Sequence, residues 1–489
     1  MRPAPDRPNV ILIFADQWRG DCLSHQGHPI VKTPFIDELA ARGASLSCAY
    51  SATPSCIAAR ASLFTGQSPR THGRVGYQDG VPWNYETTLA GEFTRAGYQT
   101  QAVGKMHVFP ERERMGFDNV VLHDGFLHHA RKHHRDMSSV DDYIPWLRRE
   151  TGRPDADYFD HGVSCNSWVA RPWDKEEYLH PTNYVVSQSI DFLRRRDPRR
   201  PFFLFMSFHR PHPPYDPPQW AFDMYNNQEM PDPRMGDWTD YFKSKRDDFN
   251  PCADVGHLDR ETMRRARAGY YGHMTHIDHQ INRFVEALPD NGIDIRNTWI
   301  IFSADHGEQM GDHDMFRKSY GYEGSARIPF IVVPPFGSKA IPAGSQPRMP
   351  AELRDIMPTL LDCAGIDIPD SVEGESLLPV LRGETTGWRE YIHGEHTRGP
   401  LMSPMFLTDG KEKYIWFSGD GHEQFFDLVN DPMELHDLAK KPDAAERVSV
   451  WRQRLIKELT GREEGFTDGK TLIPGRPVQP ALKHIRVEK

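Results

Sequence analysis

The chain has 489 residues, which is too long for one ordinary hydrophobic core and predicts two or three domains. Its 38% hydrophobic and 26% charged residues are typical of a soluble globular protein. The 59 Lys and Arg residues against 69 Asp and Glu residues give a net charge of −10, which argues against a nucleic-acid-binding surface.

The cysteines indicate a reducing compartment. They are scattered, without a C-x-x-C pair, so zinc ribbons, thioredoxin-type motifs and a disulfide framework are not expected. The six are Cys22, Cys48, Cys56, Cys165, Cys252 and Cys363. No apolar run has the length of a transmembrane helix, and no membrane association is expected. We therefore expect a cytoplasmic protein, unless a leader peptide has been removed.

Apolar runs alternate with amphipathic helices along the first three quarters of the chain. Buried strands are predicted at 9–14, 98–103, 202–208, 298–303 and 330–333, and helices at 34–43, 56–65, 87–96, 184–193, 263–288 and 353–364. The first four strands end in polar or charged residues, and ligands bind at this edge of doubly wound sheets. The pattern predicts a three-layer α/β domain with a mostly parallel central sheet.

The stretch from about 124 to 180 does not follow this alternation, and we interpret it as an insertion over the active face. Its histidines are expected to be solvated; these are His128, His129, His133 and His134. Trp168, Arg171 and Trp173 are candidates for stacking on a substrate ring. The long helix after residue 260 carries three further histidines on one flank, which are also expected to be solvated: His273, His276 and His279.

Near residue 389 the sequence pattern changes to short predicted strands separated by turn residues. Strands are expected at 390–392, 405–407, 414–417 and 425–428, followed by a helix at 444–459. We therefore predict a catalytic domain over 1–385 and a smaller C-terminal α+β subdomain with an antiparallel sheet over 386–489. His393, Glu395 and His396 lie where this subdomain could reach the active site.

Cys56 begins an alanine-rich stretch that Gly66 ends, so it is predicted at a helix N-terminus with Arg60 on the same helix face. Free backbone N–H groups and the helix dipole favour an anion at this position. A small buried structural cysteine is the simpler interpretation of this stretch taken alone.

Two strand ends supply candidate metal ligands, namely Asp16 with Gln17 and Asp305 with His306. Carboxylate and amide oxygens suit Ca²⁺, Mg²⁺ or Mn²⁺. Four cationic or polar donors are expected around the same edge: Lys105, His107, His212 and Lys318. A metal with these donors predicts a pocket for a tetrahedral anion.

The order of these motifs resembles that of a known family. Cys56-x-x-x-Arg60 followed by Leu63-Phe64-Thr65-Gly66 resembles the signature of the sulfatases, in the alkaline phosphatase superfamily. The resemblance covers nearly the whole chain. It also includes Asn9 to Gln17, Gly104-Lys105-x-His107, Pro211-His212-x-Pro214-Tyr215, Asp305-His306-Gly307-Glu308, Lys318, Phe426-Asp427-Leu428 and Asp431-Pro432-x-Glu434.

The resemblance implies an alkaline-phosphatase-like sandwich and a formylglycine-dependent enzyme. A formylglycine-generating enzyme would oxidise Cys56, and the hydrated aldehyde would present two hydroxyls. One hydroxyl would attack the sulfur of a sulfate ester, and loss of the proton from the other would expel sulfate. The implied metal site consists of Asp16, Gln17, Cys56, Asp305 and His306, with Ca²⁺ favoured and Mn²⁺ or Mg²⁺ left open.

The resemblance also implies roles for the other site residues. Arg60 would hold the formylglycine, and His107 would assist removal of the proton from the hydrate. Lys105 and Lys318 would bind sulfate oxygens, and His212 would stabilise or protonate the leaving oxygen.

The chain departs from the commonest family pattern at two places. Ala58-Ala59 occupies a position where the family usually has proline and a small polar residue or alanine, and the modifying enzyme reads this stretch. Gln17 occupies a position where the family more usually has an aspartate, and His306 one where it frequently has an asparagine. Both side chains keep an atom that can bind the metal.

Two other functions stay open. A phosphonate monoester or phosphodiester hydrolase of the same superfamily resembles this chain at the metal ligands, although the Lys105-x-His107 pair favours a sulfatase. A silent anion- or glycan-binding protein would result if Cys56 stayed unmodified. The sequence does not distinguish aryl from carbohydrate sulfates, nor a monomer from a homo-oligomer.

Overall fold

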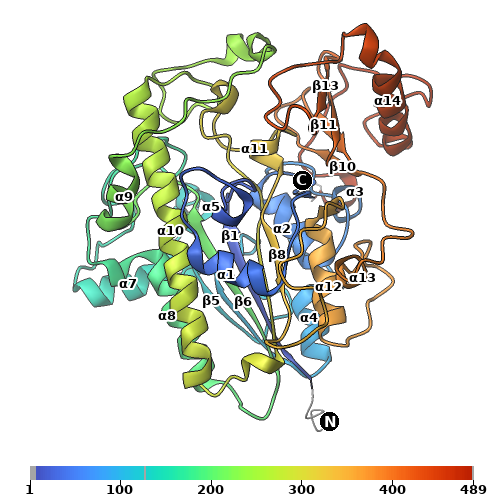
Figure 1. Cartoon of the computed structure of the whole chain (residues 1–489). Helices are drawn as coiled ribbons and strands as arrows, with labels where there is room; N and C mark the ends of the chain where they lie inside the picture. Colours follow the sequence, from blue (N-terminus) through green and yellow to red (C-terminus); the bar gives the residue numbers. More distant parts are fainter. Residues whose placement is uncertain (1–6, 126–127, 487–489) are drawn as a thin grey trace.

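The predicted apolar strands form the middle of a seven-stranded sheet in the computed structural model, which describes residues 7–125 and 128–486 (Figure 1). In spatial order the strands are β2 (Ala44–Ser45), β8 (Phe330–Val333), β7 (Thr298–Ala304), β1 (Asn9–Asp16), β6 (Phe202–Pro211), β4 (Gln99–Gly104) and β5 (Asn119–Leu122). The pairs from β7 to β5 are parallel, whereas β8 is antiparallel to both β7 and β2.

Strand β1 shows why the sheet lies between two helical layers. Its residues from Val10 to Asp16 are all buried. Successive side chains of a strand point to opposite faces, and Ile11 and Ile13 join one core while Leu12 and Phe14 join the other. Helices α1, α8 and α10 contribute to the first core, and α2, α4 and α12 to the second. The predicted three-layer architecture is confirmed.

The six helices predicted in the α/β part lie close to their expected positions, as α1, α2, α4, α8, α10 and α12, and the other helices of this part were not predicted. The helices of the α/β part are α1 (Pro34–Arg42), α2 (Cys56–Thr65), α3 (Pro69–His72), α4 (Leu89–Arg95), α5 (His128–Lys132), α6 (Met137–Val140), α7 (Tyr143–Thr151), α8 (Pro181–Arg195), α9 (Gln219–Asn226), α10 (Arg260–Asp290), α11 (Glu323–Ala326), α12 (Ile356–Cys363) and α13 (Leu378–Leu381). Among the described helices, none is long and apolar enough to cross a membrane.

The C-terminal region holds a separate antiparallel sheet. Its strands are β10 (Ile392–Glu395), β11 (Pro404–Thr408), β12 (Glu412–Phe417) and β13 (Glu423–Asp427), paired in sequence order. Helix α14 (Ala445–Leu459) packs on this sheet through Trp451 and Leu455. A two-stranded pair, β3 (Ala49–Tyr50) with β9 (Ala351–Glu352), completes the strands. The boundary at 385/386 stays a prediction.

Two of the expectations about histidines are wrong. His273 and His276 on α10 are fully buried, not solvated, while His279 is exposed as predicted. The periodicity of α10 marks one apolar face, but α8, α9 and the loop after β6 cover a wider part of the helix, and Asp216 of that loop lies 3.2 Å from His273 Nε2.

Candidate active site

The four central parallel strands deliver the predicted site residues to one edge of the sheet. Asp16 is the last residue of β1, and Asp305 directly follows β7, which is in register with β1 at this end. Lys105 directly follows β4, and His212 directly follows β6. All four side chains are buried, with at most 1% of their surface exposed. The strand ends predicted from the sequence are therefore neighbours in space.

Cys56 is the first residue of α2, whose N-terminus points at this edge. The helix is buried along its whole length and ends at Gly66 in the left-handed conformation, as predicted. The Cys56 sulfur lies 3.6 Å from Asp16 Oδ1, 3.3 Å from His306 Nε2 and 3.2 Å from Lys318 Nζ. The thiol thus joins groups from three distant parts of the chain.

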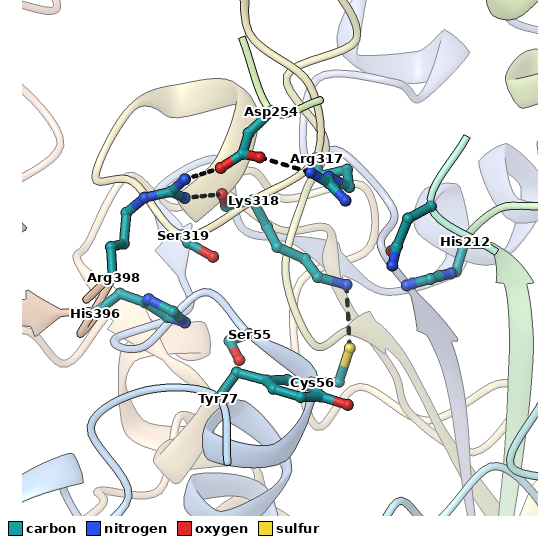
Figure 2. A pocket seen from close by; sticks show the side chains of 11 residues that line it. Ser55, Cys56, Tyr77, His212, Asp254, Arg317, Lys318, Ser319, His396 and Arg398 are labelled. Carbon is teal, nitrogen blue, oxygen red and sulfur yellow. Dashed lines mark hydrogen bonds and ion pairs between the residues drawn. The ribbon is translucent and has the colours of Figure 1, made fainter. Parts of the chain in front are cut away.

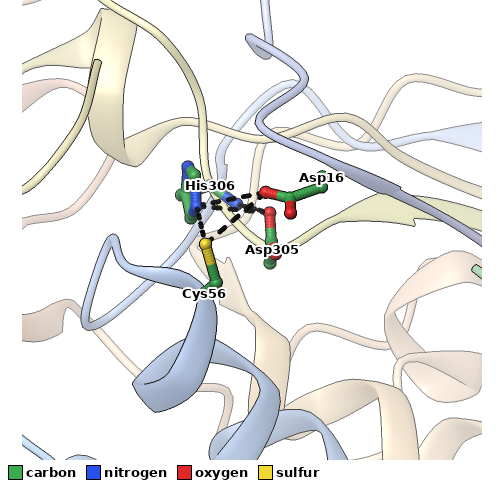
Figure 3. Close-up of side chains that lie close together, drawn as sticks. All are labelled: Asp16, Cys56, Asp305 and His306. Atoms are coloured by element: carbon green, nitrogen blue, oxygen red, sulfur yellow. Dashed lines mark hydrogen bonds and ion pairs between the residues drawn. The ribbon is translucent and has the colours of Figure 1, made fainter. Parts of the chain in front are cut away.

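Four side chains form a cluster that could hold a metal ion: Asp16, Cys56, Asp305 and His306, with one ligand atom from each within 4.8 Å of the others (Figure 3). His306 Nε2 lies 3.5 Å from Asp16 Oδ1 and 3.5 Å from Asp305 Oδ1. These separations leave room for a cation between the donors, and two buried carboxylates supply the negative charge that it needs. The residues present therefore fit a divalent metal.

Buried cations balance the charge of the two carboxylates. Lys105 Nζ pairs with Asp16 Oδ2, and Arg60 Nε pairs with Asp305 Oδ2 at 3.1 Å. The Arg60 Nη1 group also donates to the Lys105 carbonyl at 2.7 Å and to Ser207 Oγ at 3.0 Å. Arg60 therefore links α2 to β4, β6 and β7, in agreement with its predicted position on the helix face of Cys56.

The electrostatics favour an anion at position 56. Burial and the Asp16 carboxylate both oppose ionisation of the thiol, but Lys105, Lys318 and His306 outweigh them and hold the pKa of Cys56 well below its usual value. Burial likewise opposes ionisation of Asp16, yet Lys105 and the other cations hold its pKa well below the ordinary range.

Gln17 is oriented by a residue to which no role was assigned from the sequence. Its Nε2 group donates to the buried carboxylate of Glu308, which turns Oε1 toward Lys318 Nζ at 2.8 Å. Glu308 also accepts from Tyr215 Oη at 3.2 Å and from the backbone N–H of Met310 at 2.8 Å. The position of Glu308 two residues after His306 was the signal in the sequence that it could belong to the site. Neither spacing nor periodicity predicts that Glu308 faces Gln17.

His107 reaches the site from the segment after β4. Its backbone N–H donates to Asp124 Oδ1 at 2.9 Å, and its Nε2 lies 3.6 Å from Asp79 Oδ1. Burial and Lys105 lower the pKa of His107, but the contacts with Asp79 and Cys56 prevail and raise it. Asp79 and Asp124 were missed, because loop carboxylates far apart in sequence carry no pattern.

The pKa of His212 is shifted in the opposite direction from that of His107. Burial and the nearby Lys318 keep the pKa of His212 well below its usual value. Its Nδ1 atom lies 2.9 Å from the Pro213 carbonyl, so Nδ1 carries the proton.

A cavity of about 310 Å³ opens above Cys56 (Figure 2). It is lined by Ser55, Cys56, Tyr77, Asn166, His212, Asp254, Arg317, Lys318, Ser319, His396 and Arg398. Lys318 extends across it to the Cys56 sulfur. The cavity is the place for a substrate.

The expected stacking residues do not contact the cavity, because Trp168, Arg171 and Trp173 are not among the described residues that line it. Trp168 and Trp173 are buried and do not line it; Trp168 packs on Phe316 with ring centroids 4.6 Å apart. Among the described residues of 124–180, only Asn166 lines the cavity. His133 and His134 are exposed as predicted, His129 is half-buried, and the side chain of His128 lies outside the described residues.

The C-terminal region does reach the cavity, through one of the three residues suggested. His396 lines it, but Glu395 is turned into a bidentate ion pair with Arg462, at 2.6 and 3.0 Å, and His393 is not among the lining residues.

Comparison with known proteins shows the family of this chain. The family model named Sulfatase matches residues 8–366, and a second, described as N-sulphoglucosamine sulphohydrolase, C-terminal, matches residues 311–461. The chain belongs to the sulfatase family. The predicted fold and enzyme class, a sulfuric ester hydrolase on an alkaline-phosphatase-like fold, are confirmed at the level of this family.

Three similar proteins each cover at least 89% of this chain. An arylsulfatase of Clostridium perfringens is 52% identical over 488 residues, which cover 98% of this chain and 100% of the relative. A choline-sulfatase of Rhizobium meliloti is 30% identical, covering 89% and 83%. Among solved structures, a phosphonate monoester hydrolase of Agrobacterium radiobacter superposes with a TM-score of 0.77 at 26% identity, covering 97% and 99%.

Proposed function

We propose that this protein hydrolyses sulfate monoesters to an alcohol and inorganic sulfate, with Cys56 as the precursor of a formylglycine nucleophile. The observation that carries the proposal is the convergence of Cys56 with Asp16, Asp305 and His306 beneath a cavity that also presents Lys318 and His212. A formylglycine at position 56 supplies two hydroxyls, one for attack on sulfur and one for release of sulfate.

The surrounding side chains suit the separate requirements of that reaction. Lys105 and Lys318 carry the positive charge needed by sulfate oxygens and by the charge that develops in the transition state. His107, whose pKa is raised by Asp79 and Cys56 against the effect of burial, is placed to take a proton from position 56. His212 lies in the cavity wall, and because its Nδ1–H is bound to the Pro213 carbonyl, its Nε2 would have to take up a proton in the substrate complex to stabilise or protonate the leaving oxygen.

We propose Ca²⁺ as the metal, held by Asp16, Gln17, Asp305 and His306 together with position 56. Asp16, Gln17 and Asp305 supply the carboxylate and amide oxygens that Ca²⁺ prefers, and the nitrogen of His306 leaves Mn²⁺ as the alternative. Bound metal would supply Lewis-acid stabilisation of negative oxygen.

The second candidate is a phosphonate monoester hydrolase, favoured by the likeness to the structure from Agrobacterium radiobacter. The Lys105-x-His107 pair at the site supports the sulfatase instead, as does the 52% identical arylsulfatase.

The test combines mass spectrometry of the peptide that contains Cys56 with kinetics on 4-nitrophenyl sulfate and on a phenyl phosphonate monoester. We expect formylglycine at position 56 and a higher kcat/KM for the sulfate. An unmodified thiol in an active preparation would overturn the formylglycine mechanism, and faster turnover of the phosphonate would assign the chain to the second candidate.

A further inference from the structure

The cavity above Cys56 is polar for a site that would take a plain aromatic alcohol. Ligand pockets are usually lined by apolar and aromatic side chains with a few polar groups. Here Tyr77 is the one phenol or phenyl ring in the described lining, and the other positions carry hydroxyl, amide, imidazole, thiol or charged groups. The cavity therefore offers polar groups to the alcohol part of the substrate, besides those assigned to the sulfate group.

Two of these polar groups are buried and have no hydrogen-bond partner among the described residues. They are the hydroxyl of Ser55, in a residue with 1% of its surface exposed, and the imidazole of His396, with 4% exposed. In His396 both ring nitrogens are unpartnered. A buried polar group without a hydrogen-bond partner costs about 1–3 kcal/mol of free energy. A ligand that supplies the missing hydrogen bonds removes this cost and therefore binds more tightly.

Ser55 is available because it does not act as a helix cap. It stands at the N-cap position of α2, where a serine hydroxyl usually accepts from a backbone N–H of the first turn. In α2, which is described over its whole length, the Ser55 side chain accepts no hydrogen bond from the backbone of the first turn. Ser55 lines the cavity beside Cys56.

His396 comes from the opposite, C-terminal part of the chain. It follows β10, and its backbone N–H is fixed by the Pro404 carbonyl at 3.1 Å. Burial and the nearby Arg398 hold the pKa of His396 well below its usual value, so the imidazole is neutral and offers one donor and one acceptor. Figure 2 shows the ring directed into the cavity near Ser55.

We infer that Ser55 and His396 form a hydrogen-bonding subsite for a hydroxyl next to the sulfated oxygen. The substrates would then be monosulfates of vicinal diols, the class that includes ring-sulfated sugars, rather than simple aryl sulfates. A hydroxyl both donates and accepts, which matches a neutral imidazole and a serine hydroxyl. The inference rests on the proposed sulfatase function and specifies the alcohol that the site accepts.

The test uses two chromogenic substrates that differ by one hydroxyl, 4-nitrocatechol 1-sulfate and 4-nitrophenyl sulfate, and in both the sulfated oxygen is para to the nitro group. In the catechol ester the hydroxyl lies next to the sulfated oxygen. The quantity measured is the ratio of kcat/KM for the catechol ester to kcat/KM for the phenyl ester, in the wild type and in His396→Leu. We expect the substitution to lower this ratio about 5- to 10-fold, the size of one hydrogen bond. Ser55→Ala should lower it about threefold.

Because both substrates are measured on one preparation, the ratio does not depend on the folded fraction or on the extent of formylglycine conversion. His393→Leu is the matched control, since His393 lies on the same strand but outside the cavity lining, and it should leave the ratio unchanged. Restoration of part of the ratio by His396→Asn would support the hydrogen-bonding role.

The outcomes separate the two proposals. If both esters are cleaved and His396→Leu leaves the ratio unchanged, the subsite is wrong while the sulfatase function stands. If the wild-type protein with formylglycine at position 56 cleaves neither ester, the proposed function fails, and the subsite fails with it.

Discussion

At the scale of single residues, the charge balance of the site depends on Lys105. Its ammonium pairs with the Asp16 carboxylate at a position where neither side chain has any exposed surface. An uncompensated charge in such a place is costly, and a cation here also favours an anion at position 56.

Lys105→Ala is therefore expected to lower kcat/KM for 4-nitrophenyl sulfate by about 100-fold or more, as removal of a transition-state donor does. The unfolding transition should stay cooperative, because the buried ion pair between Arg60 and Asp305 remains in the variant. The measurement is steady-state kinetics with thermal unfolding followed by circular dichroism, and exposed Lys457→Ala on α14 is the control. Activity within tenfold of the wild type would contradict the role of Lys105.

At the scale of elements, the loop after β6 shows how the fold positions His212. Arg210 and Asp216 close this loop with a buried bidentate pair, with bonds of 3.0 Å from both Nε and Nη2. Asp216 also meets His161 Nε2 at 2.9 Å and lies 3.2 Å from His273 Nε2. His161 and His273 thus belong to a structural network around the loop that carries His212.

Asp216→Ala should destabilise the protein by about 3–5 kcal/mol, because it leaves the Arg210 guanidinium buried without its carboxylate. It should also reduce kcat by displacing His212. Denaturant unfolding measures the first effect and single-turnover kinetics the second. The exposed pair of Arg195 with Asp191 on α8 is the comparison, and Asp191→Ala should cost less than about 1 kcal/mol. A similar loss of stability in both variants would contradict this account.

A second element-scale contact joins the C-terminal sheet to α11. Lys413 on β12 pairs with Glu323 and with Glu434, each at 2.8 Å. Burial raises the pKa of Glu434; Lys413 opposes this and the Glu323 charge adds to it, so that the value is about 7. Glu434 is buried and shares its ammonium partner with the half-buried Glu323, so Glu434 keeps its proton more readily than an exposed carboxylate.

The sign of the pH dependence follows from this raised pKa. The folded state holds a proton that the unfolded state, with an ordinary pKa of 4.5, releases, so stability is lost as pH rises from about 4.5 to about 7. Glu434→Gln removes this contribution. We expect its unfolding temperature to fall less than that of the wild type over this window, by about 2 °C, in calorimetry at matched ionic strength. Parallel curves for the two proteins would contradict the shift.

At the scale of the whole molecule, the metal cluster connects segments that are far apart in sequence. Its members come from β1, the start of α2 and the end of β7, so a bound ion crosslinks the N-terminal and middle parts of the α/β layer. An ion that binds the folded state alone raises stability by mass action.

Removal of divalent metal with EDTA is expected to abolish hydrolysis and to lower the unfolding temperature, and Ca²⁺ should restore both more effectively than equimolar Mg²⁺. The unfolding temperature reports binding independently of turnover. Asp305→Asn weakens the cluster and should lose most of the Ca²⁺-dependent shift, whereas Asp362→Asn, outside the cluster on α12, should keep it. An EDTA-treated protein with unchanged activity and stability would exclude the metal proposal.

The sequence by itself determined the sheet, the helix at Cys56 and the membership of the site's inner residues. Continuous apolar runs can only be buried strands, and parallel strands place their carboxyl ends at one edge, so Asp16, Lys105, His212 and Asp305 had to meet. The resemblance to sulfatases added Lys318, which no periodicity locates.

Only the tertiary structure decided which residues support and surround that site. Glu308, Asp79 and Asp124 act through contacts between loops, and loop contacts leave no regular pattern in a sequence. Trp168, His273 and His276 looked available for ligands or water, but packing between elements buried them. The same packing brought His396 from the C-terminal region to Ser55 beside Cys56. Local patterns specify elements and their ends, whereas long-range packing decides what lines the cavity between them.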